Sequence, residues 1–176
     1  MSIASPEKKI EFIPVRVAVV TVSDTRTEET DKSGAYLVEC VNAAGHVLVS
    51  KQIVKDDTYK LRAVVATLIA DDSVQAVLLT GGTGFTFRDN TVNAVTPLLD
   101  MHIEGFGELF RQLSFAEIGC STIQSRVFAG LTNGTIVFCL PGSPGACRTG
   151  WEGIVSQQLD SRHRPCNFVD KLKKIG

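Results

Sequence analysis

Apolar runs of the kind that form buried strands recur through the first half of the chain. Residues 15–22 form a continuous, mainly β-branched run, which is typical of a strand buried on both faces of a parallel sheet. Residues 46–54 predict a second strand, with Val47 among its inward positions, and residues 75–79 predict a third. Polar or glycine-rich residues follow each run, so each strand is expected to end in a loop.

Helical spacing of apolar positions fills the segments between these runs. A first helix is expected to open at residues 31–33 and to close at Gly45, which would serve as its C-cap. A second helix begins directly after the second strand. A third, over residues 91–100, contains Pro97, which should kink or split it because proline cannot donate a backbone hydrogen bond.

The second half of the chain predicts a helix, a hairpin and a last helix. Residues 105–117 and 146–159 have the helical spacing, whereas residues 126–131 and 135–140 are strand-like. Asn133-Gly134 between the two strands is a strong hairpin signal. Together these elements predict an α/β fold, a three-layer sandwich on a mostly parallel sheet with an added antiparallel hairpin.

The composition is that of one globular domain. Of 176 residues, 44% are hydrophobic and 21% charged, which suits a single filled core and excludes a disordered chain. We expect an N-terminal extension over residues 1–14, one domain over residues 15–168 and a C-terminal tail over residues 169–176. No internal repeat or linker divides the chain.

Charge and hydropathy exclude several classes of protein. The net charge of −1 provides no field that would attract nucleic acid or an anionic membrane. The N-terminus lacks the apolar core of a signal peptide, and no run reaches the roughly 18 apolar residues that cross a bilayer. A cytoplasmic protein is expected. The five cysteines form no Cys-x-x-Cys, so neither a disulfide framework nor a zinc site is predicted.

Four polar clusters follow predicted strands. They are Ser23-Asp24, Asp56-Asp57, Thr80-Gly81-Gly82-Thr83-Gly84 and Pro141-Gly142-Ser143-Pro144-Gly145. Ligands of open α/β sheets bind outside the carboxyl ends of the strands, so these clusters could converge on one site.

The glycine-rich loop, residues 80–84, suits phosphate binding. Glycines let the backbone approach an anion and direct N–H groups at it, and threonine hydroxyls add donors. The loop is not a Walker A motif, because no Gly-Lys-Ser/Thr follows it. It is not the dinucleotide fingerprint either, because Phe87 stands where a third glycine would be. The alternative is a tight turn that binds no ligand.

Carboxylates near this loop have two interpretations. Asp89 could hold magnesium beside a bound phosphate, or Asp89 or Asn90 could cap the following helix. Asp56 and Asp57 present the same choice, and capping is expected for one of the two.

The Pro-Gly loop, residues 141–145, directly precedes the last helix. It could present Ser143 and backbone N–H groups to a ligand, or simply turn the chain. Large aromatic residues are expected outside the binding site, with Phe106, Phe110 and Phe115 in the core and Trp151 in the core or at an interface.

Taken together, these loops resemble the MoaB/Mog family of molybdenum cofactor biosynthesis proteins, which includes the G domain of gephyrin and its plant counterpart. The resemblance covers roughly residues 15–166. The matching segments occur in family order, at residues 19–24, 80–84, 88–91, 105–108, 125–126 and 141–144. Residues 148–152 and 164–168 are similar to the MoaB branch in particular.

The resemblance implies the same α/β sandwich and a defined chemistry. Active members transfer AMP from ATP to the terminal phosphate of molybdopterin, a phosphorylated pterin, and release pyrophosphate. Magnesium is therefore the expected cofactor, with ATP and molybdopterin as substrates. Asp89 would hold magnesium and assist the transfer, and Asp56 would be the second essential carboxylate. The implied substrate-binding residues are Ser23, Asp24, Thr80, Gly81, Gly82, Thr83, Gly84, Pro141, Gly142 and Ser143.

One departure from the family pattern bears on activity. The family loop commonly continues Asp-x-Thr-Pro-Glu-Ala, whereas Val92 and Asn93 stand here in place of the proline and the glutamate. A missing proline could change the angle at which the helix starts, and Asn93 supplies no charge. The alternatives to an enzyme are a non-catalytic molybdopterin-binding paralogue and a scaffold protein of the same pathway.

The resemblance also implies self-association. A homotrimer or homohexamer is expected, with other proteins of the molybdenum cofactor pathway as possible partners. Trp151 and Ile154 are candidate interface residues if they are exposed.

Overall fold

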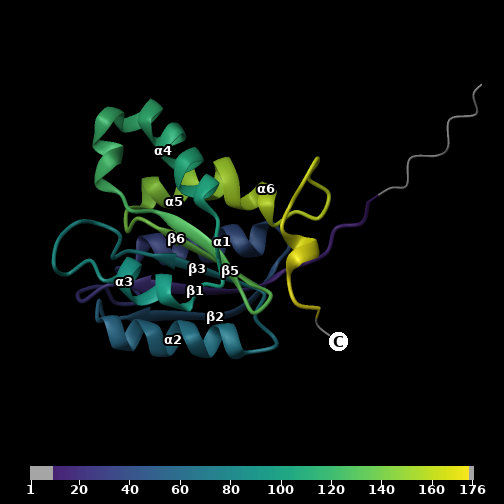
Figure 1. Cartoon of the computed structure of the whole chain (residues 1–176), viewed down its shortest axis with the longest axis horizontal. Coiled ribbons are helices and arrows are strands. Elements are labelled where there is room, and N and C mark those ends of the chain that lie inside the picture. Colours follow the sequence, from purple (N-terminus) through teal and green to yellow (C-terminus); the bar gives the residue numbers. More distant parts are fainter. Residues whose placement is uncertain (1–9, 175–176) are drawn as a thin grey trace, which may run out of the picture.

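A single six-stranded sheet forms the centre of the molecule, which the computed structural model describes for residues 10–174 (Figure 1). Residues 1–9 of the predicted N-terminal extension and residues 175–176 of the predicted tail lie outside this range. The strand order is β2-β1-β3-β6-β5-β4. The strands are β1 (Arg16–Val22), β2 (Val47–Val54), β3 (Ala76–Thr80), β4 (Met101–His102), β5 (Phe128–Thr132) and β6 (Thr135–Leu140).

The sheet is mostly parallel, as the sequence predicts. Strands β2, β1, β3 and β6 run parallel, whereas β5 pairs antiparallel with β6, and β4 pairs antiparallel with β5. The predicted hairpin turns at Asn133 and Gly134, both of which have positive φ. The two-residue strand β4 was not predicted, because two exposed residues show no alternation of apolar and polar positions.

Helices cover both faces of the sheet. On one face lie α1 (Lys32–Ala43), α4 (Glu104–Ile118) and α5 (Pro144–Gly150), which continues into a π-helical turn, η3 (Trp151–Val155), and α6 (Ser156–Gln158). On the other lie α2 (Thr58–Ala70) and α3 (Thr91–Val95), followed by the 3₁₀ turn η1 (Thr96–Leu98). Two further 3₁₀ turns are η2 (Gly119–Gln124) and η4 (Val169–Lys171). The predicted three-layer sandwich is confirmed (Figure 1).

The continuous apolar run of β1 follows from this arrangement. Val17 and Val19 pack into the core beneath α1 and α4, whereas Ala18 and Val20 pack into the core beneath α2. Since both faces of the strand are covered by helices, the successive positions 17–20 are all apolar, instead of alternate ones.

Two helix ends are also as predicted. Gly45 follows α1 with a φ of +82°, the left-handed conformation that closes many helices. The helix that begins at Thr91 ends at Val95 and continues as a 3₁₀ turn containing Pro97, so proline does split it.

Other expectations were wrong. Val47 is 40% exposed because β2 is an edge strand, and Phe115 is 60% exposed on α4 instead of buried. The last helix begins at Pro144, two residues earlier than predicted. Trp151 is buried in the core, as expected, but Ile154 is buried with it, so neither residue is available for an interface.

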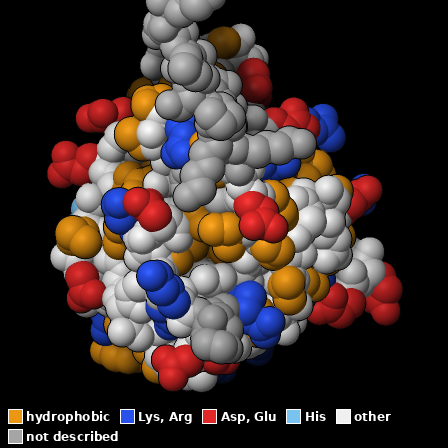
Figure 2. Space-filling view, turned by 90° about the vertical axis from the view of Figure 1, so that its right-hand side faces the viewer, with side chains coloured by type: hydrophobic (Ala, Val, Ile, Leu, Met, Phe, Trp, Pro, Cys, Tyr) orange, Lys and Arg blue, Asp and Glu red, His pale blue; other side chains and the backbone are white. Residues whose placement is uncertain are grey.

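The face at the amino ends of the parallel strands carries both ends of the described part of the chain (Figure 1). Basic and acidic side chains are intermixed across its described part, with apolar side chains between them (Figure 2). Among the described residues, no helix is both long and apolar enough to cross a membrane.

Candidate functional site

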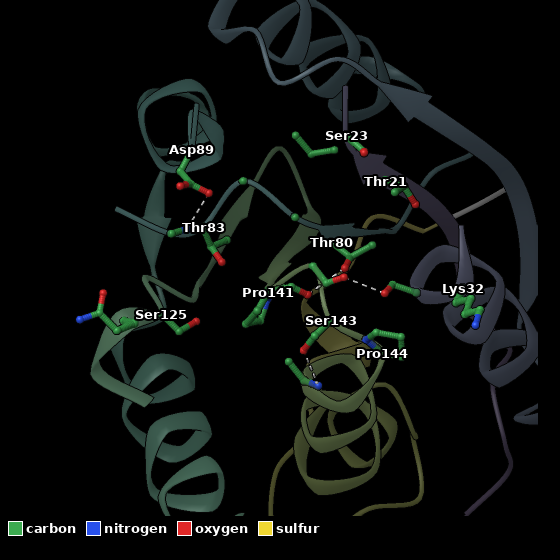
Figure 3. A pocket seen from close by; sticks show the side chains of 18 of the residues that line it. Thr21, Ser23, Lys32, Thr80, Thr83, Asp89, Ser125, Pro141, Ser143 and Pro144 are labelled. Atoms are coloured by element: carbon green, nitrogen blue, oxygen red, sulfur yellow. Dashed lines mark hydrogen bonds between the residues drawn. The ribbon is translucent and has the colours of Figure 1, made fainter. Parts of the chain in front are cut away.

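A pocket of about 710 Å³ opens where the parallel strands end, at their carboxyl edge (Figure 3). Loops that follow β1, β3 and β6 form it together with the start of α1, the end of α4 and η2. A larger hollow, of about 1170 Å³, lies at the opposite edge among residues 10–16 and 161–174. That hollow contains none of the carboxyl-end loops, so we place the candidate site in the smaller pocket.

The glycine-rich loop has a shape that only glycine permits at two positions. Gly81 and Gly82 have φ of +105° and +66°. A Cβ on Gly81 would lie 2.3 Å from the carbonyl oxygen of Val22, and one on Gly82 would lie 2.3 Å from Thr91 Oγ1. These glycines therefore bring the loop against β1 and α3, and they leave its backbone facing the pocket.

The Pro-Gly loop lies directly against the glycine-rich loop. A Cβ on Gly142 would meet the Cα of Gly81 at 3.3 Å. Thr80 Oγ1 donates to the Pro141 carbonyl at 2.8 Å, and Ser33 Oγ donates to the Gly142 carbonyl at 2.8 Å. Hydrogen bonds from two other elements thus hold this loop in place, and Ser143 within it is the N-cap of α5.

Asp89 closes the glycine-rich loop on itself. Its Oδ1 accepts from the Gly84 N–H at 3.0 Å, and its Oδ2 accepts from the Thr86 N–H and hydroxyl at 2.9 and 2.6 Å. Partial burial acts to raise the pKa of Asp89, but the hydrogen bonds from Thr86 and Gly84, with the nearby Arg126 charge, hold that pKa below its usual value. A carboxylate is therefore stabilised here.

Neither Asp89 nor Asn90 caps the following helix through its side chain. The N-cap of α3 is Asn90, and its side chain makes no capping hydrogen bond. Instead the Asn90 N–H donates to Asp56 Oδ1 at 2.9 Å. The capping interpretation is thus wrong at this helix.

The pair Asp56-Asp57 divides into two roles. Asp57 caps α2, because its Oδ1 accepts from the backbone N–H groups of Tyr59 and Lys60. Asp56 faces the glycine-rich loop instead, where its Oδ2 would lie 2.9 Å from a Cβ on Gly82. The expectation that one of the two is a cap is confirmed.

Charge accumulates around Asp56. Burial raises its pKa, and the charges of Asp89 and Asp24 raise it further, against the hydrogen bonds from Asn90. Asp24 itself is paired with Arg88, and this hydrogen bond is the main reason why its pKa is lowered. Asp56 is the member of this group that a nearby cation would stabilise most.

Of these carboxylates, Asp89 alone lines the pocket, so a magnesium ion there would need substrate phosphates and water as its remaining ligands. Magnesium is usually bound through one or two carboxylates together with substrate phosphates. Within the described residues, Asp56 Oδ2 accepts no hydrogen bond, and no cluster of three or more His, Cys, Asp or Glu could hold a metal alone. A cage built from protein ligands only is therefore not the arrangement here.

Ten of the predicted site residues line the pocket and two do not. The ten are Ser23, Thr80, Gly81, Gly82, Thr83, Gly84, Asp89, Pro141, Gly142 and Ser143. Asp24 and Asp56 lie behind the glycine-rich loop and are joined to each other, since the Asp56 N–H donates to Asp24 Oδ1 at 3.2 Å.

Several lining residues were missed in the sequence. Asp31, Lys32 and Ser33 line the pocket, although their pattern indicated only the start of a helix. Asp31 is 3% exposed and accepts from the Thr21 hydroxyl at 2.7 Å. The pattern of the sequence shows that Asp31 begins a helix, but it does not show that this charged residue is buried beside the pocket. The η2 segment, Gly119–Gln124, also lines the pocket and gave no sequence signal, whereas Ser125 directly after it belongs to a segment that resembles the family.

A three-layer α/β fold with a glycine-rich loop beside a Pro-Gly loop at the carboxyl edge defines a class of small-ligand-binding α/β proteins. Residues 18–161 match the family model described as "Probable molybdopterin binding domain". The chain belongs to this family, and its similarity places it in the MoaB branch.

Curated relatives and solved structures agree. Molybdenum cofactor biosynthesis protein B of Escherichia coli strain K12 is 56% identical over 164 residues, covering 93% of this chain and 96% of the relative. The protein of the same name from Bacillus subtilis strain 168 is 45% identical, and the match covers 82% of this chain and 86% of the relative. A crystal structure of Molybdenum cofactor biosynthesis protein B superposes with a TM-score of 0.81 at 47% identity, covering 84% and 92%. The crystal structure of the tungsten cofactor synthesizing protein MoaB from Pyrococcus furiosus superposes with a TM-score of 0.74 at 36% sequence identity. The superposition covers 82% of this chain and 92% of that one.

Proposed function

We propose that this protein acts in molybdenum cofactor biosynthesis, where it binds molybdopterin and transfers AMP from Mg-ATP to its terminal phosphate. The family description and the names of the relatives support the pathway. The observation that carries the proposal is the packing of the glycine-rich loop against the Pro-Gly loop in one pocket, which Lys32 and Asp89 also line. Glycine-rich turns of this kind suit phosphate groups, and both substrates of the proposed reaction carry them.

The transfer would proceed by attack of an oxygen of the terminal phosphate on the α-phosphorus of ATP. One P–O bond forms, the bond between the α-phosphorus and its bridging oxygen breaks, and pyrophosphate leaves. The backbone of residues 81–84 would hold one phosphate, and Ser143 with Lys32 would hold the other. Positioning is the main contribution of the protein, because the reaction needs no covalent intermediate.

Magnesium would be held by Asp89 and the substrate phosphates, and when bound it would screen the two approaching negative charges. Asp56 would act on the same centre from behind the loop. Burial and the charges of Asp89 and Asp24 raise its pKa, and a nearby cation would oppose that effect.

A second candidate is molybdopterin binding without transfer. It is favoured by the hydrogen bonds of Asp89, whose two carboxylate oxygens already accept from Gly84 and Thr86. In that case the carboxylate would shape the loop and hold no metal.

One assay separates the two candidates. Purified protein is incubated with molybdopterin, magnesium and ATP, and adenylylated product is measured beside the dissociation constant of molybdopterin. Asp89→Asn should lower turnover at least about 100-fold, as expected for loss of a charge-stabilising group, and change molybdopterin affinity less than about threefold. Asp57→Asn, the same change at a helix cap, is the matched control and should turn over normally.

The outcomes are distinct. If the wild-type protein binds molybdopterin but forms no adenylylated product, the second candidate is correct. If it does not bind molybdopterin, both are wrong.

A further inference from the structure

Arg126 contacts a loop of the candidate site without lining the pocket. It lies two residues before β5, and its side chain lines a neighbouring cavity of about 580 Å³ together with Phe85 and Ser125. It is therefore not placed to touch a ligand in the pocket. An effect of Arg126 on the chemistry must act through the segment that its side chain contacts, residues 84–89, which we call the Asp89 loop.

The guanidinium of Arg126 fastens both ends of the Asp89 loop. Its Nε donates to the Gly84 carbonyl at 2.7 Å, and its Nη2 donates to the Asp89 carbonyl at 2.9 Å. Between these two points the guanidinium carbon lies 5.2 Å from the centroid of the Phe85 ring, within the range of a cation–π contact. The backbone N–H of Arg126 also donates to the Thr83 carbonyl at 2.9 Å, directly before the loop. One residue thus holds the first and the last residue of the loop.

The Asp89 carboxylate depends on the end of the loop that Arg126 holds. Asp89 Oδ1 accepts from the Gly84 N–H, whereas the Gly84 carbonyl accepts from Arg126, so both backbone groups of Gly84 are hydrogen-bonded. A Cβ on Gly84 would lie 2.7 Å from Asp89 Oδ2, which shows how closely the carboxylate packs on this residue. The position of the carboxylate is therefore set by the position of Gly84.

The peptide group between Asp89 and Asn90 extends this hold to Asp56. Its carbonyl accepts from Arg126 Nη2, and its N–H donates to Asp56 Oδ1 at 2.9 Å. Hydrogen bonds at the two ends of one peptide group polarise and strengthen each other. Asn90 Nδ2 also donates to the Asp56 carbonyl at 3.1 Å. A single peptide group, held by Arg126, thus connects the two carboxylates of the candidate site.

We propose that Arg126 is a positioning residue, whose guanidinium fixes the Asp89 loop and thereby sets the Asp89 and Asp56 carboxylates relative to the pocket. The consequence for turnover rests on the proposed function. Arginine suits this role because its planar fork directs two N–H groups at two carbonyls at once. A lysine ammonium is a compact charge on a flexible stem, so Arg126→Lys would keep the charge and lose the two-point hold.

Amide hydrogen exchange of the ligand-free protein measures the hold directly. In Arg126→Lys and Arg126→Ala, the amides of Gly84 and Thr86, which donate to Asp89, should exchange at least about tenfold faster. Amides of the central strand β1 should exchange as in the wild type, which shows that the fold is intact. Guanidinium ion, added far below denaturing concentrations, should restore the protection in Arg126→Ala but not in Arg126→Lys, where the lysine side chain fills the space.

Arg62→Lys is the matched control. The Arg62 guanidinium also lies over an aromatic ring, 5.5 Å from the centroid of Tyr59, and its Nη2 donates to the Asn93 carbonyl at 3.0 Å. Arg62 lies on α2 and lines neither the pocket nor the neighbouring cavity. This variant should leave the exchange of the Gly84 and Thr86 amides, and turnover, as in the wild type.

Turnover tests whether the hold matters for the reaction. In Arg126→Lys, kcat should fall at least about tenfold, because small displacements of positioned groups are costly in catalysis. The dissociation constant of molybdopterin should change less than about threefold, since Arg126 does not line the pocket. A loss of affinity as large as the loss of kcat would show general damage to the pocket and would overturn the positioning role.

The remaining outcomes separate this inference from the proposed function. If both Arg126 variants protect the Gly84 and Thr86 amides as the wild type does, Arg126 does not hold the loop and the inference is wrong. If protection is lost but kcat is unchanged, the hold does not position the carboxylates for the reaction, and the inference is again wrong. If the wild type transfers no AMP while exchange and guanidinium rescue follow the expectation, the hold on the Asp89 loop stands and the proposed transfer does not.

Discussion

Gly82 provides the most direct test of how the glycine-rich loop is held. In Gly82→Ala the added methyl group would lie 2.3 Å from Thr91 Oγ1 and 2.9 Å from Asp56 Oδ2. The Thr91 hydroxyl is buried and donates to the Gly81 carbonyl at 2.8 Å, so it can move away only by breaking that hydrogen bond. The substitution therefore affects both backbone conformation and packing.

The expected cost can be worked from these two effects. An alanine at a φ of +66° costs roughly 1–2 kcal/mol of conformational energy. Loss of a hydrogen bond between buried groups costs about 1–3 kcal/mol more. Alanine also lowers the conformational entropy of the unfolded chain relative to glycine, which offsets roughly 0.4–1 kcal/mol of this destabilisation. The free energy of unfolding should fall by about 3 kcal/mol, and the affinity for anions should fall with it.

Chemical denaturation followed by circular dichroism measures this change. Gly105→Ala is the control, because a Cβ there meets nothing within 4 Å and the residue lies in the first turn of α4. It should be neutral or stabilise by up to about 1 kcal/mol. If Gly82→Ala unfolds within 0.5 kcal/mol of the wild type, on the order of the spread of surface substitutions, the loop does not require glycine at this position.

Three further substitutions test other parts of the structure. Asp57→Ala should destabilise the protein by about 1 kcal/mol in urea titration through loss of the α2 cap, with molybdopterin affinity unchanged. Burial lowers the pKa of His46, and its Nδ1 accepts a hydrogen bond from the Val15 N–H. Below the ordinary histidine pKa near 6.5, the imidazole therefore binds a proton in the unfolded chain but not in the native protein. Stability should thus fall as pH drops below about 6.5, and His46→Gln should flatten that dependence in denaturation curves measured from pH 7 to pH 5. Trp151→Ala should cost about 3–5 kcal/mol in thermal or chemical unfolding, because the side chain is buried in the core; a loss below about 1 kcal/mol would contradict that assignment.

The sheet and its loops could be predicted because they depend on local pattern. A strand covered on both faces favours apolar residues at successive positions, and residues 17–20 show this directly. Loops at the carboxyl ends of parallel strands then meet at one edge without further information. For this reason ten of the predicted site residues do line one pocket.

Exposure and unpatterned segments could not be predicted. Helical spacing shows that Phe115 shares α4 with buried residues, but not that nothing within the described chain covers it. Trp151 and Ile154 show the opposite case, since both are enclosed by elements distant in sequence. The turn η2 has neither strand nor helix periodicity, so its place beside the pocket became visible only in three dimensions.

The two residues that depart from the family pattern have little effect on the pocket in this geometry. The missing proline would have set the start of α3, but the Thr91 N–H donates to the Gly82 carbonyl at 3.0 Å and its hydroxyl donates to the Gly81 carbonyl, which fixes that start by other means. Asn93 is exposed and does not line the pocket, so a glutamate there would also lie outside it. The proposed transfer of AMP is therefore better tested at Asp89 and Asp56 than at the substitutions that follow them.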